Sequence, residues 1–131
     1  MSELAASFLR FARRDLAGAR RLLPDMPALA AFHLQQAAEK LVKAELAALG
    51  MSPPKLHDIG HLAGLLPPDY PRRPVLAALD KLTAYAVAAR YPESEQLTAD
   101  LDPELLARWA DEIGALLDDA PSAPPPDTAD G

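Results

Sequence analysis

The residues best suited to chemistry lie on one segment, residues 32–44, where donor side chains recur at helical spacing. In a helix of about 100° per residue, the apolar residues of this segment gather on one side and the polar residues on the other. The polar side carries basic and amide groups, namely Gln36, Lys40 and Lys43, flanked by His33 and Glu39. Glu39 precedes Lys43 by four residues, the favourable order for an ion pair. We therefore expect a helix with a core side and a side that faces a ligand or solvent.

Further candidates lie after this helix. His57 and Asp58 follow a loop with paired prolines, and Arg90 and Tyr91 precede Pro92 at the end of a predicted helix that also holds Tyr85. In a functional arrangement, His57 and Arg90 would meet the stripe on the long helix and aim several donors at one phosphate or base. In a structural arrangement, Arg90 complements the helix dipole and His57 holds its loop through a backbone hydrogen bond. The sequence leaves both open.

Other reaction types find little support. The chain has no cysteine, no Gly-x-Ser-x-Gly elbow and neither of the common glycine-rich phosphate loops, so we expect no nucleophilic catalysis and no cofactor. The doublet His57-Asp58 before Ile59-Gly60-His61 resembles that of HD-type metal phosphohydrolases, for which His33 and Asp100 or Asp102 are the available further ligands. Such a doublet normally sits in a longer helical frame, and here it follows a Pro-Pro loop.

Helical spacing of apolar residues predicts the elements that must position these groups. The predicted helices cover about residues 3–23, 28–49, 58–66, 74–90 and 103–117, and prolines or Gly50 separate them. Ser2 and Asp102 are suitable N-caps. No segment has a strand pattern. We expect an all-α fold, an antiparallel four- to five-helix up-and-down bundle over residues 1–119, and a disordered Pro/Ala/Asp tail over residues 120–131.

Composition and charge limit the possible partners. The net charge is −6, yet residues 1–60 hold eight Lys and Arg against six Asp and Glu, whereas residues 61–131 hold five against thirteen. A local basic face is therefore compatible with an acidic chain. No apolar run is long enough to span a bilayer and no signal peptide is evident, so we expect a cytoplasmic protein without a membrane partner. The alanine-rich apolar faces bury little area, which favours a homodimer or a higher homo-oligomer.

Three short motifs in this order resemble the HEPN domain proteins of bacteria and archaea. They are residues 31–40 (AFHLQQAAEK) with Lys43, residues 55–59 (KLHDI), and Tyr85 followed by Arg90-Tyr91-Pro92. The resemblance covers nearly all of the chain except the tail. It implies a helical bundle that usually dimerises, is often encoded beside a minimal nucleotidyltransferase, sometimes as a toxin–antitoxin pair, and binds a nucleotide or RNA.

Many proteins of that family look like metal-independent endoribonucleases in which a histidine follows an arginine after four to six residues. Arginine can hold the scissile phosphate while histidine moves the proton of the attacking 2′-hydroxyl. None of the nine arginines here has a histidine at that spacing, and Arg90, at the expected place, is followed there by residues 95–97 (EQL). We therefore predict a non-catalytic binding module. The alternative is a degenerate, toxin-like endoribonuclease that uses His57 or His61.

Overall fold

Two long antiparallel helices, α1 (Ser2–Leu22) and α2 (Pro27–Ala48), form the base of the computed structural model, which describes residues 2–88, 91 and 101–121. α1 has an acidic residue in its first turn and two arginines in its last, as its dipole favours. α2 starts with a proline at its first position and ends before Gly50, whose φ of 85° lies in the left-handed region that favours glycine. Both helices lie where the sequence predicts them.

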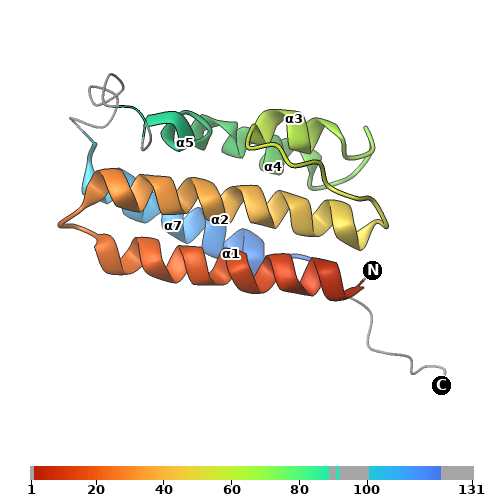
Figure 1. Cartoon of the computed structure of the whole chain (residues 1–131), viewed down its shortest axis with the longest axis horizontal. Helices are drawn as coiled ribbons and strands as arrows, with labels where there is room; N and C mark the ends of the chain where they lie inside the picture. The colour runs from red at the N-terminus through yellow and green to blue at the C-terminus, as the bar shows by residue number, and fades with distance from the viewer. Residues whose placement is uncertain (1, 89–90, 92–100, 122–131) are drawn as a thin grey trace.

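α2 is the central helix of the fold. Figure 1 shows α1 on one side of α2, the shorter helices α3 (Ile59–Gly64), α4 (Arg73–Ala77) and α5 (Ala84–Ala88) on the opposite side, and α7 (Pro103–Asp118) behind α1 and α2. α2 is consequently buried on nearly all sides, and even Glu39 and Lys43 are only 4% and 9% exposed. The prediction that α2 has one core side and one open side is wrong for these two residues, because three layers of helix surround it.

The segment predicted as one helix over residues 74–90 consists instead of α4, a 3-10 helix η1 (Ala78–Leu82) and α5 in its described part. Leu76, Leu79 and Leu82 are fully buried at a spacing of three, which suits the three residues per turn of a 3-10 helix. Asp80 and Thr83 explain the break, because both face α3. Asp80 Oδ1 accepts from the N–H of Gly60 and Thr83 Oγ1 accepts from the N–H of Ile59.

α7 closes the bundle. Its N-cap is Asp102, whose side chain accepts from the N–H of Glu104, as the sequence predicts. Two arginines of α1 reach across to α7: Arg13 pairs with Asp118 and Arg20 with Asp111. The all-α helical bundle is thus confirmed, and the described residues contain no strand. No helix among them combines the length and the apolar character that a bilayer crossing requires.

Candidate functional site

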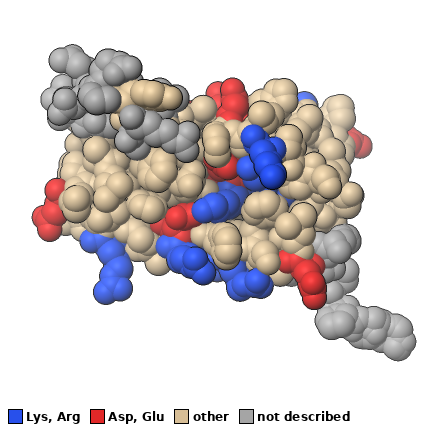
Figure 2. Space-filling view, in the orientation of Figure 1, with Lys and Arg blue, Asp and Glu red and all other residues tan. Residues whose placement is uncertain are grey.

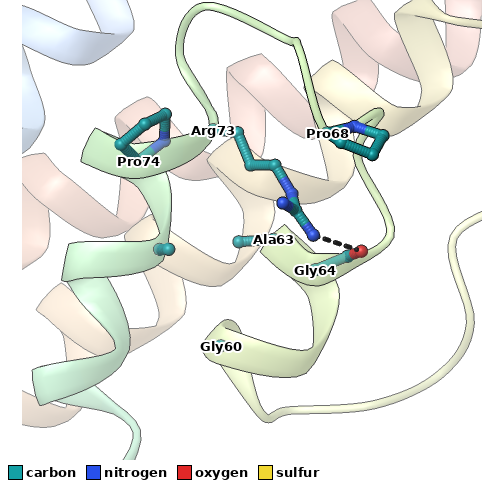
Figure 3. A pocket seen from close by; sticks show the side chains of 7 residues that line it. Gly60, Ala63, Gly64, Pro68, Arg73 and Pro74 are labelled. Atoms are coloured by element: carbon teal, nitrogen blue, oxygen red, sulfur yellow. Dashed lines mark hydrogen bonds between the residues drawn. The ribbon is translucent and has the colours of Figure 1, made fainter.

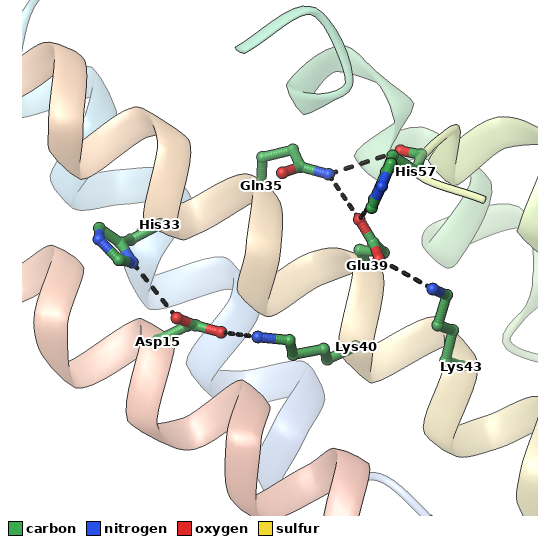
Figure 4. Close-up of polar contacts among 7 residues, drawn as sticks. All are labelled: Asp15, His33, Gln35, Glu39, Lys40, Lys43 and His57. Atoms are coloured by element: carbon green, nitrogen blue, oxygen red, sulfur yellow. Dashed lines mark hydrogen bonds and ion pairs between the residues drawn. The ribbon is translucent and has the colours of Figure 1, made fainter. Parts of the chain in front are cut away.

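A buried carboxylate, that of Glu39, organises the first group of polar side chains (Figure 4). Lys43 Nζ lies 2.9 Å from Glu39 Oε2, and His57 Nδ1 lies 3.0 Å from Oε1. Gln35 Nε2 donates to Oε1 over 3.0 Å and lies 3.5 Å from the carbonyl oxygen of His57. We call these four residues the Glu39 cluster. It joins two turns of α2 to the loop before α3, and it contacts His57 both at the imidazole, through Glu39, and at the backbone carbonyl, through Gln35.

The electrostatics of the Glu39 cluster favour the ionised carboxylate. Burial by itself raises the pKa of Glu39, but hydrogen bonds from Lys43, His57 and Gln35 outweigh it and hold the pKa below its ordinary value. An ionised carboxylate only accepts hydrogen bonds, so the nearby Nδ1 of His57 carries a proton and the other ring nitrogen, Nε2, is left for another partner. The His57 side chain is 53% exposed. The cluster therefore presents a fixed imidazole to solvent.

A second group lies on the other flank of α2, where it faces α1. Asp15 of α1 accepts from Lys40 Nζ through Oδ2, and its Oδ1 lies 3.2 Å from His33 Nδ1. We call Asp15, His33 and Lys40 the Asp15 cluster. It repeats the composition of the first cluster, since one carboxylate bridges a histidine and a lysine. Lys40 Nζ also lies 5.8 Å from the centre of the Phe11 ring, and the guanidinium of Arg14 lies 4.8 Å from the same ring centre.

The predicted site residues therefore divide between two clusters. The structure brings Lys43 and His57 together at Glu39, whereas Lys40 belongs to the Asp15 cluster and Gln36 is half-buried. The other predicted residues lie elsewhere: Asp58 accepts from the N–H of His61 at the start of α3, Tyr85 packs near Trp109 with ring centres 6.1 Å apart, and Tyr91 is exposed. Arg90 lies outside the described residues, so the predicted meeting of Arg90 with the other donors remains a prediction.

A third polar group was missed by sequence reasoning. The side chain of Glu45 in α2 is fully buried. Its carboxylate accepts hydrogen bonds from Nε and Nη2 of Arg72, with Nη2 at 2.7 Å from Oε2, and from the hydroxyl of Tyr70, which lies 2.6 Å from Oε1. Arg72 also donates to the carbonyl of Leu116 in α7 over 2.7 Å. Burial, with the hydrogen bond to Glu45, raises the pKa of Tyr70. This group connects α2, the loop before α4 and α7, and it is structural because Glu45 has no exposed surface.

The arrangement gives little support to a metal site. His57 faces Glu39, Asp58 caps α3 and Asp102 caps α7, so these side chains already have separate partners; Asp100 lies outside the described residues. Within the described part of the chain, no three His, Asp or Glu residues are grouped closely enough to hold an ion. Among the described residues, the ligands named for the phosphohydrolase interpretation are therefore not brought together.

Two features of the described surface lie beside the clusters: a group of basic side chains over α1 and α2, and a small hollow between α3 and α4. Figure 2 shows several Lys and Arg side chains over α1 and α2, with Asp and Glu side chains among and beside them. The hollow, of about 350 Å³, lies between α3 and α4 and is lined mainly by glycine, alanine and proline (Figure 3). Its single charged side chain, Arg73, donates to the carbonyl of Gly64 over 3.1 Å. None of the lining residues belongs to either cluster.

Comparison with known proteins gives one match. The sequence profile of the HEPN domain matches residues 5–117, which span α1 to the last turn of α7. No curated protein and no solved structure matches the chain. The matched range includes both clusters and all the predicted site residues.

Proposed function

We propose that this chain, which belongs to the HEPN domain family, binds the phosphate of a nucleotide or RNA without cleaving it. The family supports a helical module with a role connected to nucleotides or RNA. The observation that carries the proposal is the Glu39 cluster, in which one buried carboxylate holds Lys43 and the exposed imidazole of His57.

The chemistry of this cluster suits a phosphate group. The Nε2 atom of His57, the ring nitrogen that does not face Glu39, would point at the phosphate. Lys43 has three ammonium protons, and it donates one of them to Glu39 in a hydrogen bond. Lys40 lies three residues earlier on the same helix, about 5–6 Å away between Cβ atoms. Charge-assisted hydrogen bonds of this kind are shorter and stronger than neutral ones.

The proposal extends to the other predicted residues. Gln36, Lys40 and Tyr91 would contact the sugar or base, and Arg90 would add a second cation. HEPN domains commonly dimerise, and we propose a homodimer here, with a minimal nucleotidyltransferase as a further partner of toxin–antitoxin type. These assignments rest on the family and on the residues that match its motifs.

The test compares two histidines that lie four residues apart. His57→Ala removes the imidazole held by Glu39, whereas His61→Ala removes the side chain of an exposed residue at the start of α3. His61 donates to Asp58 through its backbone N–H, which the substitution keeps. Loss of a charge-assisted hydrogen bond is worth roughly 1.5–3 kcal/mol, so His57→Ala should weaken binding of labelled RNA or ATP by about tenfold or more in fluorescence anisotropy. His61→Ala should bind as the parent does. Equal affinity of both variants and the parent would exclude this site.

Lys40→Ala and Arg90→Ala test the remaining donors by the same assay. If both variants bind nucleotides, RNA and the partner protein as the parent does, the ligand does not extend beyond the Glu39 cluster. Circular dichroism of each variant checks that the helical fold is retained.

A second candidate function has one observation in its favour. A histidine whose Nδ1 faces a buried carboxylate is oriented like a general base, and His57 could in this way replace the missing downstream histidine of a metal-independent endoribonuclease. Purified protein incubated with structured and unstructured RNA in EDTA, with and without its partner, tests this candidate. Cleavage that His57→Ala abolishes would establish it, and intact RNA would remove it.

A further inference from the structure

Phe11 is an exposed aromatic residue in the middle of α1. Its side chain is 44% exposed although it lies on a helix whose other side packs against α2. Two cations lie over its ring: the guanidinium of Arg14 at 4.8 Å and the ammonium group of Lys40 at 5.8 Å from the ring centre. An exposed ring between two cations is more than a stray surface phenylalanine, because the cations come from two different helices.

The Asp15 cluster fixes one of these cations in place. Lys40 is bonded to Asp15, and Asp15 also faces His33, so the ammonium group is held in place 5.8 Å from the ring centre. The carboxylate side chain of Asp15 is only 15% exposed. The surface around Phe11 therefore combines a partly exposed apolar ring with two cations.

We propose that Phe11 is a stacking surface for a nucleobase and that the ligand is single-stranded RNA that extends from the Glu39 cluster to α1. This inference rests on the proposed function and specifies its ligand class. Base stacking on an exposed aromatic side chain, supported by neighbouring cations, is the general mode by which single strands are held. Lys40 lies both in the Asp15 cluster and 5.8 Å from the centre of the Phe11 ring, so a strand with a phosphate near Lys40 would carry a neighbouring base toward Phe11.

A second copy of this chain is the competing occupant of this surface. In a two-fold symmetric contact centred on Phe11, Arg14 and Lys40 of one copy would face the same cations of the other. That repulsion disfavours a homodimer through this surface, whereas a polyanion is attracted by the same charges.

The experiment compares Phe11→Ala with Leu4→Ala, which removes a side chain of equal exposure from the same helix. The probes are a short oligoadenylate, AMP and inorganic polyphosphate, which carries charge without bases. Stacking is worth about 1–3 kcal/mol per base, so Phe11→Ala should weaken oligoadenylate binding at least about fivefold and leave polyphosphate binding unchanged. Leu4→Ala should change neither. Phe11→Trp in a Trp109→Phe background should bind like the parent and show quenched fluorescence with oligoadenylate.

Several outcomes would overturn the inference. Unchanged oligoadenylate binding by Phe11→Ala, an equal loss for oligoadenylate and polyphosphate, or a shift from dimer to monomer in size-exclusion chromatography each contradict a stacking role. AMP that binds as tightly as the oligomer would contradict a strand as ligand. If Phe11→Ala has no effect while His57→Ala does, the stacking inference fails and the proposed function stands. If neither variant has an effect, both fail.

Discussion

Lys43→Met provides a direct test of the Glu39 cluster, because it removes the cation and keeps most of the apolar stem. Glu39 and Lys43 expose only 5% and 11% of their side chains, so solvent cannot replace the lost partner. Removing one member of a buried ion pair costs roughly 3–5 kcal/mol. His57 and Gln35 still donate to Glu39 in this variant, so we expect about 3 kcal/mol, at the lower end of that range.

The pH dependence of this loss follows from the lowered pKa of Glu39. In the parent, the ionised carboxylate contributes stability that is fully present above the ordinary pKa of a glutamate, about 4.3, and that is lost as the pH falls through the lower folded-state value. In Lys43→Met the largest remaining influence on the carboxyl group is burial, which raises its pKa, so the folded variant takes up a proton more readily than the parent. The stability difference between the two proteins should therefore be largest near pH 7 and shrink toward pH 4.

Urea unfolding followed by circular dichroism at pH 7 and pH 4 measures both effects. With a slope of roughly 1–3 kcal/mol per molar urea, 3 kcal/mol lowers the midpoint by about 1–3 M at pH 7. The matched control is Lys81→Met, which breaks the pair of Lys81 with Glu112, whose side chains are 37% and 34% exposed. That variant should lose at most about 1 kcal/mol. If the two variants lose equal stability, or if the loss in Lys43→Met is the same at both pH values, the account of the Glu39 cluster is wrong.

Two further predictions concern the structural polar groups. Arg72→Lys cannot reproduce the two-nitrogen contact with Glu45 or the bond to Leu116, so we expect a loss of about 3 kcal/mol in urea unfolding, and a loss below 1 kcal/mol would contradict the structural role of this group. Gly60→Ala would bring a Cβ to 2.9 Å from the carboxyl carbon of Asp80 and displace the carboxylate that accepts from the N–H of residue 60, which offsets the better helix propensity of alanine. In an Asp80→Ala background the same substitution should stabilise by about 0.5–1 kcal/mol, and an equal thermal shift in both backgrounds would argue against the clash.

The long helices could be predicted because their causes are local. Alanine and leucine at helical spacing, proline at the first position of α2, Gly50 after its end and Asp102 before α7 all act within a few residues. The ion pair of Glu39 with Lys43 was also predictable from its spacing and is confirmed at 2.9 Å.

The remaining features depend on contacts between distant segments. The break of the predicted helix over residues 74–90 arises because Asp80 and Thr83 serve the start of α3, which periodicity cannot reveal. Likewise, the sequence pattern predicts an open polar side of α2, because charged residues are usually exposed. Glu39 and Glu45 are buried here because His57 and Arg72, far along the chain, supply partners for them.

Buried carboxylates also explain how an acidic chain can offer cations to a ligand. Asp15 and Glu39 contribute negative charge to the total, but both are covered by the helices and by the side chains that they hold. Lys40 and Lys43 are somewhat more exposed than the carboxylates that hold them, with 22% and 11% of their side chains exposed against 15% for Asp15 and 5% for Glu39. The same carboxylates hold Lys40, Lys43 and His57 in fixed positions, which lowers the entropy that binding would otherwise cost. Replacing either carboxylate should therefore weaken anion binding despite making the chain less negative, a direction opposite to that expected from net charge alone.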